Sequence, residues 1–179
     1  MNADLVSAVI NAANNLSAAF WTFLWALAGL MGFIFGAKTI HAWIQDTQRP
    51  GPPTVSNGAK LSIFFIGVFL VNLPRFIDMT SESIGLGTRG FSPIAYSSTE
   101  QFGALAQGID AVLTLAAMFG GWFAFKGLLL LKAASETSGR GQYSSQMTAQ
   151  GLGHIFGGAC LVQIPKLIDL ATETLGINW

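Results

Sequence analysis

Residues 70–78 read LVNLPRFID, and residues 161–169 read LVQIPKLID. The two stretches match position by position, and their differences keep the chemistry, with Gln for Asn and Lys for Arg. The match extends to residues 61, 65, 67, 82 and 85, which are identical to residues 152, 156, 158, 173 and 176. An internal repeat decides the architecture before any local pattern does. The repeat predicts two copies of one unit, residues 1–87 and 88–179.

The composition indicates a membrane protein. Hydrophobic residues make up 51% of the chain and charged residues only 10%, against about 25% charged in soluble domains. Nine basic and nine acidic side chains give a formal net charge of +0. This balance predicts no sequence-specific nucleic-acid binding. The single cysteine, Cys160, lies in an apolar run and is expected to be buried.

The first half predicts a short amphipathic helix, a membrane span, a loop and a shorter apolar segment. Apolar residues within 3–16 follow helical spacing. Residues 18–37 carry no charge and are long enough to cross a bilayer. Trp21 and Trp43 would lie about 33 Å apart along a helix, as the two aromatic belts of a span do. Residues 46–60 are expected to be a loop, followed by the apolar segment 61–73.

The second half repeats this plan. Residues 102–131 predict a long apolar helix, 132–150 a polar loop and 152–164 a shorter apolar segment, while residues 86–100 join the halves. The expected fold is an all-α integral membrane protein, a tandem duplication of a helical hairpin. It would contain about four long helices and a short N-terminal helix. Two crossings in each unit make the repeats parallel.

The basic residues predict the orientation. Most of them lie in or beside the two hairpin loops, which the positive-inside rule places in the cytoplasm with both termini outside. No positively charged region precedes the first apolar stretch, which favours a retained span over a cleaved signal peptide. The basic residues concerned are Lys38, Arg49, Lys60, Lys126, Lys132 and Arg140.

The repeated motif predicts an amphipathic helix that starts at a proline. At 100° per residue, Arg75, Asp78 and Glu82 share one face of a helix over 73–85, and Lys166, Asp169 and Glu173 do the same in the second copy. Pro74 and Pro165 would bend or restart the helix. Gly85 and Gly176 fall where a helix C-cap needs positive φ. The motif predicts a membrane segment that turns along the membrane surface.

Three interpretations of these charges remain open. The basic and acidic residues of one helix can neutralise each other at the membrane border. They can instead meet the opposite charges of another copy and fix the register of an assembly. A third interpretation is an ion or proton relay. The second predicts assembly contacts at Pro74, Arg75, Asp78, Glu82, Pro165, Lys166, Asp169 and Glu173.

Small residues four apart predict close helix packing in lipid. They occur as Ala28, Gly32 and Gly36 in the first long helix, as Ala117 and Gly121 in the second, and as Gly153 and Gly157 in the last. The packing positions expected are Gly32, Gly36, Gly121 and Gly157.

No pattern indicates an enzyme. His41 and His154 occupy unrelated positions in the repeat, and one cysteine with two histidines offers no metal-ligand cluster. The glycine-containing stretches lack the flanking residues of a phosphate-binding loop. We expect no catalytic residue, no metal and no cofactor, with phospholipid as a candidate structural partner.

The order of features resembles the TraQ-type conjugal transfer proteins of I-type plasmid systems, which are related to the IcmC/DotE/DotV membrane proteins of Dot/Icm secretion systems. The resemblance rests on three features: the Gly-rich first helix ending at Lys38, the loop Pro50-Gly51-Pro52-Pro53 and the doubled Pro-Arg/Lys-x-x-Asp segment. Each half also resembles the small pilins of type IV secretion systems. That likeness implies lipid between subunits and lumen-lining or cytoplasmic loops with Arg49, Lys60, Lys132 and Arg140. The chain departs from those pilins in holding two hairpins.

The resemblance implies a structural subunit of a conjugative or type IV secretion apparatus in the bacterial inner membrane. It would assemble into a pilus or a translocation channel, with membrane lipids, copies of itself and other secretion proteins as partners. A small channel or transporter is the alternative, with Asp110 as its candidate polar group. A soluble all-helical protein is a third possibility that residues 18–37 disfavour.

Overall fold

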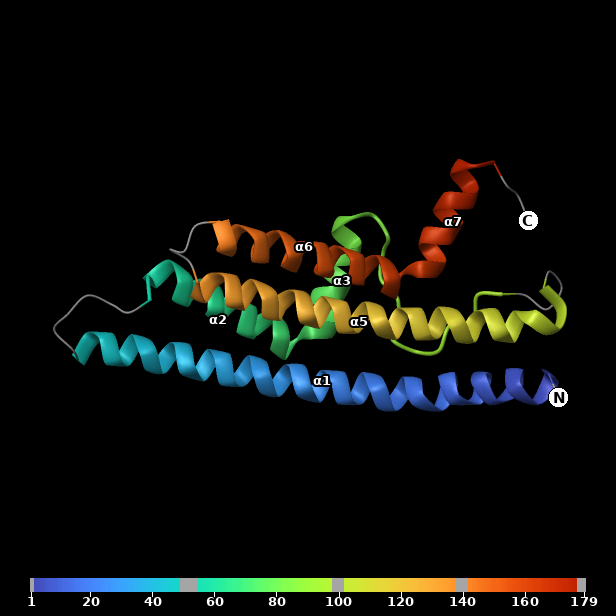
Figure 1. Ribbon diagram of the computed structural model, residues 1–179, viewed down its shortest axis with the longest axis horizontal. Coiled ribbons are helices and arrows are strands. Elements are labelled where there is room, and N and C mark those ends of the chain that lie inside the picture. The colour runs from blue at the N-terminus through green and yellow to red at the C-terminus, as the bar shows by residue number, and fades with distance from the viewer. Residues whose placement is uncertain (1, 49–54, 98–101, 138–141, 177–179) are drawn as a thin grey trace.

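The computed structural model describes residues 2–48, 55–97, 102–137 and 142–176, and within them it contains helices and no strand (Figure 1). This confirms the all-α class. The helices are α1 (Asn2–Gln48), α2 (Asn57–Val71), α3 (Leu73–Ser83), the 3₁₀ turn η1 (Gly103–Leu105), α5 (Ala106–Glu136), α6 (Gln142–Val162) and α7 (Ile164–Thr174).

The first helix is longer than predicted. Residues 3–16 do not form a separate helix, because α1 runs without a break from Asn2 to Gln48. Residues 2–28 contain neither proline nor glycine, so nothing interrupts the backbone hydrogen bonds between the amphipathic stretch and the apolar one.

The two proline motifs bend the chain as predicted. The axes of α2 and α3 meet at 99°, and those of α6 and α7 at 81°. Pro74 and Pro165 each lie in the first turn of the new helix, where a missing backbone N–H costs nothing. The preceding helix cannot continue through them, since proline cannot donate to the carbonyl one turn back.

The helix ends that follow the prolines are also confirmed. Gly85 has φ 80° and Gly176 has φ 67°. After α3, the Leu86 N–H donates to the Ser81 carbonyl at 2.9 Å and the Gly85 N–H to the Glu82 carbonyl at 2.9 Å, which is the Schellman pattern. After α7, the Gly176 N–H donates to Glu173 at 3.1 Å.

The predicted loops 46–60 and 132–150 are too long. Helix α1 continues to Gln48, and α2 starts directly after Ser56, whose hydroxyl accepts from the Ala59 N–H at 3.2 Å. Helix α5 continues to Glu136 and α6 begins at Gln142. Residues 142–150 are polar but hold no proline or glycine, and polarity alone does not end a helix.

Helices α1 and α5 run in the same direction, and α2 and α6 return antiparallel to them, while α3 and α7 turn away from the long axis (Figure 1). One hydrophobic cluster joins both halves, with Leu24, Leu70, Ile77, Leu128 and Val162 among its buried members. A smaller one, around Ile94, Leu113 and Ala117, holds the segment between the halves against α5 and α7.

Trp21 belongs to the larger cluster. It is only 5% exposed and stacks on Trp25 with 5.0 Å between ring centroids. The expectation of an aromatic belt at Trp21 is therefore wrong.

Two helices are long and apolar enough to cross a membrane: α1, over Ile10–Gln48, and α5, over its whole length. The number rises to four if each bent pair counts as one span.

Candidate functional site

The charged face of α3 is open. Arg75 and Glu82 are exposed and Asp78 is half-buried. The Asp78 Oδ1 atom is buried and accepts no hydrogen bond from the described residues. Among the described residues, the ion pairs within 4 Å are Lys60–Asp46 and Lys132–Glu136. Arg75 therefore forms no ion pair with Asp78. The face stays available for a contact outside the helix.

The charged face of α7 is held to the segment between the halves. Lys166, Asp169 and Glu173 are all exposed, and the Tyr96 hydroxyl donates to Asp169 Oδ1 at 2.8 Å. Burial, and then the hydrogen bond to Asp169, raise the pKa of the Tyr96 phenol above its usual value. The two residues lie 73 positions apart, and no sequence pattern pointed to Tyr96.

Asp110 has a structural role at the start of α5. Its Oδ1 atom accepts from the backbone N–H groups of Tyr96 at 3.0 Å and Ser97 at 2.8 Å. The Thr114 hydroxyl accepts from the Ile94 N–H at 2.8 Å. Burial lowers the pKa of the nearby Arg89 guanidinium, and the Asp110 charge opposes that shift. Asp110, the candidate polar group of the channel alternative, therefore holds the segment between the halves against the start of α5.

Glycines bring the helix backbones of each hairpin together. A Cβ atom on Gly32 would lie against the Gly67 carbonyl and 2.8 Å from the Val71 nitrogen. In the second hairpin a Cβ on Gly120 would lie 2.6 Å from the Gly158 carbonyl and 2.8 Å from the Val162 nitrogen. Cβ atoms at these distances do not fit, so both approaches require glycine.

The second hairpin has a further approach that the first lacks. A Cβ on Gly127 would lie 2.7 Å from the Gly151 carbonyl, and one on Gly151 would lie 3.0 Å from the Gly127 carbonyl. In the repeat, Thr39 and Lys60 occupy the positions of these two glycines. The side chains at those positions prevent an equally close approach of α1 and α2.

The four predicted packing glycines have different environments. Gly32 lies at the α1–α2 approach. Gly121 lies against the Trp21 ring, and a Cβ on Gly121 would lie 3.1 Å from Leu24 Cδ2. A Cβ at Gly36 or Gly157 would meet nothing within 4 Å. Gly157 is thus not a packing position within the chain, because one residue along a helix turns the side chain by about 100°. The packing glycines that sequence reasoning missed are Gly67, Gly120, Gly127, Gly151 and Gly158.

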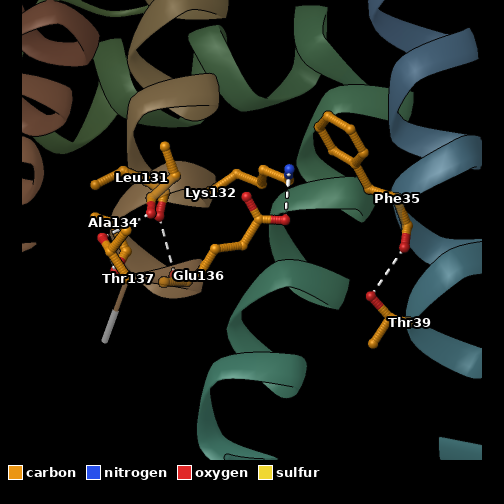
Figure 2. A network of polar contacts seen from close by, with 9 residues as sticks. Phe35, Thr39, Leu131, Lys132, Ala134, Glu136 and Thr137 are labelled. Carbon is orange, nitrogen blue, oxygen red and sulfur yellow. Dashed lines mark hydrogen bonds and ion pairs between the residues drawn. The ribbon is translucent and has the colours of Figure 1, made fainter. Parts of the chain in front are cut away.

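Two predicted loop lysines lie in helices. Lys60 is in the first turn of α2, is 3% exposed and forms an ion pair with Asp46 of α1. Lys132 lies in α5, where its ammonium is 2.6 Å from Glu136 Oε1 and 4.9 Å from the centre of the Phe35 ring (Figure 2). The prediction of loop positions is therefore wrong for both.

Lys60 and Lys132 instead tie the ends of the helices together. A charge buried as deeply as that of Lys60 needs its partner. The other two predicted loop residues, Arg49 and Arg140, lie outside the described residues.

An apolar groove runs between α1 and α2. It has a volume of about 720 Å³, and glycines 32, 36 and 67 are among its lining residues. A Cβ added to Gly36 would meet nothing within 4 Å, so the groove is open at this position. We call it the α1–α2 groove. Its exposed lining residues include Phe33, Ala37, Ile40, Val68, Val71 and Asn72.

The groove has little reactive chemistry. His41 is one of its lining residues, with its Nε2 atom 2.9 Å from Gln45 Nε2. His154, on α6, lies 2.8 Å from the Gln150 carbonyl through Nδ1. Among the described residues, no group of three or more His, Cys, Asp or Glu side chains is arranged to hold a metal ion. The groove is built for apolar contact.

No family model, curated protein or solved structure matches this chain. The surfaces of the chain itself are therefore what points to its function. These are the open charged faces of α3 and α7, the α1–α2 groove and the apolar sides of the long helices.

Proposed function

We propose that the protein is a membrane-embedded structural subunit of a conjugative or type IV secretion apparatus, which assembles with copies of itself into a pilus or a translocation channel. The observation that carries the proposal is the exposed apolar surface of the spanning-length helices. On α1, Phe23, Leu30 and Phe33 are 60–71% exposed, and on α5, Val112 and Phe119 are 61% and 62% exposed. Apolar surface this extensive needs lipid or a protein partner to cover it.

A tandem duplication is part of the proposal. Both halves have the order long helix, shorter helix and bent helix of 11 residues. The Gly32–Gly67 and Gly120–Gly158 approaches fall at corresponding places, 88 residues apart in the long helices and 91 apart in the shorter ones. The motifs that resemble conjugal transfer proteins and pilins support the biological assignment.

The proposed location is the bacterial inner membrane, with the hairpin loops in the cytoplasm and the termini outside. The concentration of basic residues around the α1–α2 and α5–α6 connections supports this orientation. The proposed partners are membrane lipids, copies of the chain and other proteins of the apparatus. The proposed role is structural and involves no catalysis.

Charge reversal on α3 tests the role. Because Asp78 is partly exposed between the exposed Arg75 and Glu82, and no ion pair within 4 Å closes this face among the described residues, we expect the face to meet opposite charges of another subunit. Asp78→Lys should abolish self-association and transfer but leave the protein resistant to alkaline carbonate extraction. Self-association is measured by amine cross-linking in membranes, and transfer by mating frequency.

The matched control is Ser83→Lys, which adds a lysine to an exposed position of the same helix outside the charged face. It should assemble normally. Normal assembly and transfer of Asp78→Lys would remove the proposed contact.

A further inference from the structure

The second half of the chain has no open counterpart of the α1–α2 groove, because the first half covers it. We call two residues counterparts if they occupy the same position in the two copies of the repeat. Counterparts lie 88 residues apart in α1 and α5, and 91 residues apart in α2–α3 and α6–α7. The six groove residues are exposed, whereas all six counterparts are buried. The counterparts are Gly121, Phe125, Leu128, Ala159, Val162 and Gln163.

The first half covers this surface with side chains of α1 and α3 and with the segment that follows α3. Trp21 and Leu24 of α1 lie against Gly121. Leu73 and Ile77 of α3 join Phe125, Leu128 and Val162 in one buried cluster. Beyond α3, the Gln163 side chain donates to the Gly87 carbonyl at 3.2 Å. The chain itself therefore shows which kind of surface fills this kind of groove.

The surface that does the covering also has a counterpart, and that counterpart is only partly covered, with Ile164 and Ile168 packed against the smaller cluster around Ile94. The covering residues Leu24, Ala28, Leu73, Ile77 and Ser81 are at most 1% exposed. Their counterparts are exposed or half-buried, and Val112 is 61% exposed. We call these counterparts the free docking face: Val112, Ala116, Ile164, Ile168 and Thr172.

The two bent helices show the same difference. Helix α3 buries Leu73, Ile77 and Ser81, whereas no residue of α7 is buried. In Figure 1, α7 projects away from the other helices near the C-terminal end of the described chain. An amphipathic helix in this position lacks the cover that its repeat partner has.

We propose that the α1–α2 groove receives the free docking face of a second copy, so that the contact inside the chain is repeated between chains. This rests on the proposed self-assembly and names the surfaces that carry it. The groove and the face are different parts of the molecule, so the contact is heterologous, and each copy keeps one groove and one face for further copies.

The larger and smaller side chains change sides between the two contacts. Inside the chain, the large Trp21 lies against Gly121, which has no side chain. Between chains the counterpart of Trp21 is Ile109 and that of Gly121 is Phe33. The larger residue then belongs to the groove and the smaller one to the docking face, so the two surfaces exchange which of them carries the larger side chain.

The geometry makes the assembly open-ended. Gly121 lies beside Trp21, but its counterpart Phe33 lies twelve residues further along α1. At about 1.5 Å per residue, the second hairpin is displaced by about 18 Å along α1. A second contact gives a similar displacement. Lys132 lies over Phe35, whereas the counterpart of Lys132 is Ile44, further along α1. The same rise per residue gives a displacement of about 14 Å.

Helices α1 and α5 run in the same direction (Figure 1), so the rotation that relates the two halves has its axis along the helices. The displacement is then a translation along that axis. A repeated step of this kind does not close into a ring but builds a helical filament.

Cysteine cross-linking tests the contact. Leu24 lies against Gly121 inside the chain, so Val112 of one copy should lie against Phe33 of the next. Both residues are exposed, at 61% and 71%, and their substitution leaves the core intact. Phe33→Cys and Val112→Cys are placed in separately tagged copies, each also carrying Cys160→Ser, and co-expressed. A short thiol-reactive cross-linker should give a heterodimer from the mixture and none from either variant alone.

Two controls make the test specific. Leu152→Cys, at an exposed α6 position outside both surfaces, should not cross-link to Phe33→Cys. Gly36→Phe fills the groove from within and should abolish the Phe33–Val112 product. Gly157→Phe, which also opens to free space, should leave that product unchanged.

The other outcomes overturn the inference. Cross-linking of Phe33→Cys with itself would indicate a symmetric contact. Self-association of the unmodified protein, by amine cross-linking, without a Phe33–Val112 product would reject these surfaces but keep the proposed structural role. A monomer whose groove holds phospholipid would reject both.

Discussion

At the residue scale, two glycine pairs set how closely each hairpin packs. Gly32 with Gly67 and Gly120 with Gly158 allow backbone atoms of neighbouring helices to touch. In lipid such approaches replace the hydrophobic driving force that soluble helices have, because van der Waals contact grows as the backbones come closer. The rest of each hairpin interface depends on these positions.

Adjacent glycines of α6 give a matched test. A Cβ on Gly158 would lie 2.5 Å from the Gly120 carbonyl and 2.7 Å from the Ala124 nitrogen, whereas one on Gly157 would meet nothing within 4 Å. Gly158→Ala should lower the free energy of unfolding by about 1–3 kcal/mol through overpacking. Gly157→Ala should be neutral or stabilising by about 0.5–1 kcal/mol, because alanine favours the helix. Thermal unfolding in detergent measures both, and equal midpoints would contradict the packing described for α6.

Sequence reasoning reached part of this packing. Four-residue spacing found Gly32 but chose Gly157 over Gly158, since it followed the register set by Gly153. The identity of Gly67 and Gly158 within the repeat was the better signal, because it marks a position that both hairpins keep. Spacing within one helix cannot show which of two neighbouring faces meets a partner.

At the element scale, the bent helices α3 and α7 carry the charged faces, and they are held differently. Helix α3 is packed against the second half, whereas α7 is attached through its bend, partly buried Ile164 and Ile168, and the Tyr96–Asp169 hydrogen bond. The position of α7 therefore depends on the protonated phenol of Tyr96, which is the donor in that bond.

The pH dependence of Tyr96 tests this attachment. The pKa of its phenol is raised by burial and by Asp169, so the contribution to stability is complete below the unfolded pKa of about 10. It is lost as the pH rises through the higher folded value, because the phenolate cannot donate and repels Asp169.

In a Tyr143→Phe background, Tyr96 is the sole tyrosine. Its tyrosinate absorbance should rise above pH about 10, and Asp169→Asn should move the rise to lower pH by removing the negative charge. If the tyrosinate absorbance of the Tyr143→Phe protein rises at or below pH about 10, and Asp169→Asn does not move that rise, the contact is absent.

The sequence predicted the bends and caps of these elements well, because proline and glycine act on their own backbone. Pro74 and Gly85 delimit α3 without help from distant residues. The loop prediction is wrong for residues 142–150, because their polar side chains do not prevent a helix. The sequence also could not predict the Tyr96–Asp169 contact, because that contact depends on how the two halves pack.

At the scale of the whole molecule, the halves share one core but are displaced along the helix axis. Pattern and spacing predicted two parallel hairpins, but not their relative height, which is set by contacts such as Trp21 against Gly121. The displacement of about 14–18 Å per hairpin corresponds to roughly 30 Å per chain. That step is about the thickness of the hydrocarbon core, so successive copies would leave the plane of the bilayer. The proposed contact thus favours a filament over a flat membrane complex.

Electron microscopy of the assembled full-length protein, sheared from expressing cells or extracted from their membranes, tests this most directly. The proposed contact predicts open-ended helical filaments in which the α1–α2 hairpin of each copy receives α5 and α7 of the next. Along each such row of chains, the axial step should be roughly 30 Å. Closed rings, or a flat lattice with all copies at one height, would contradict it.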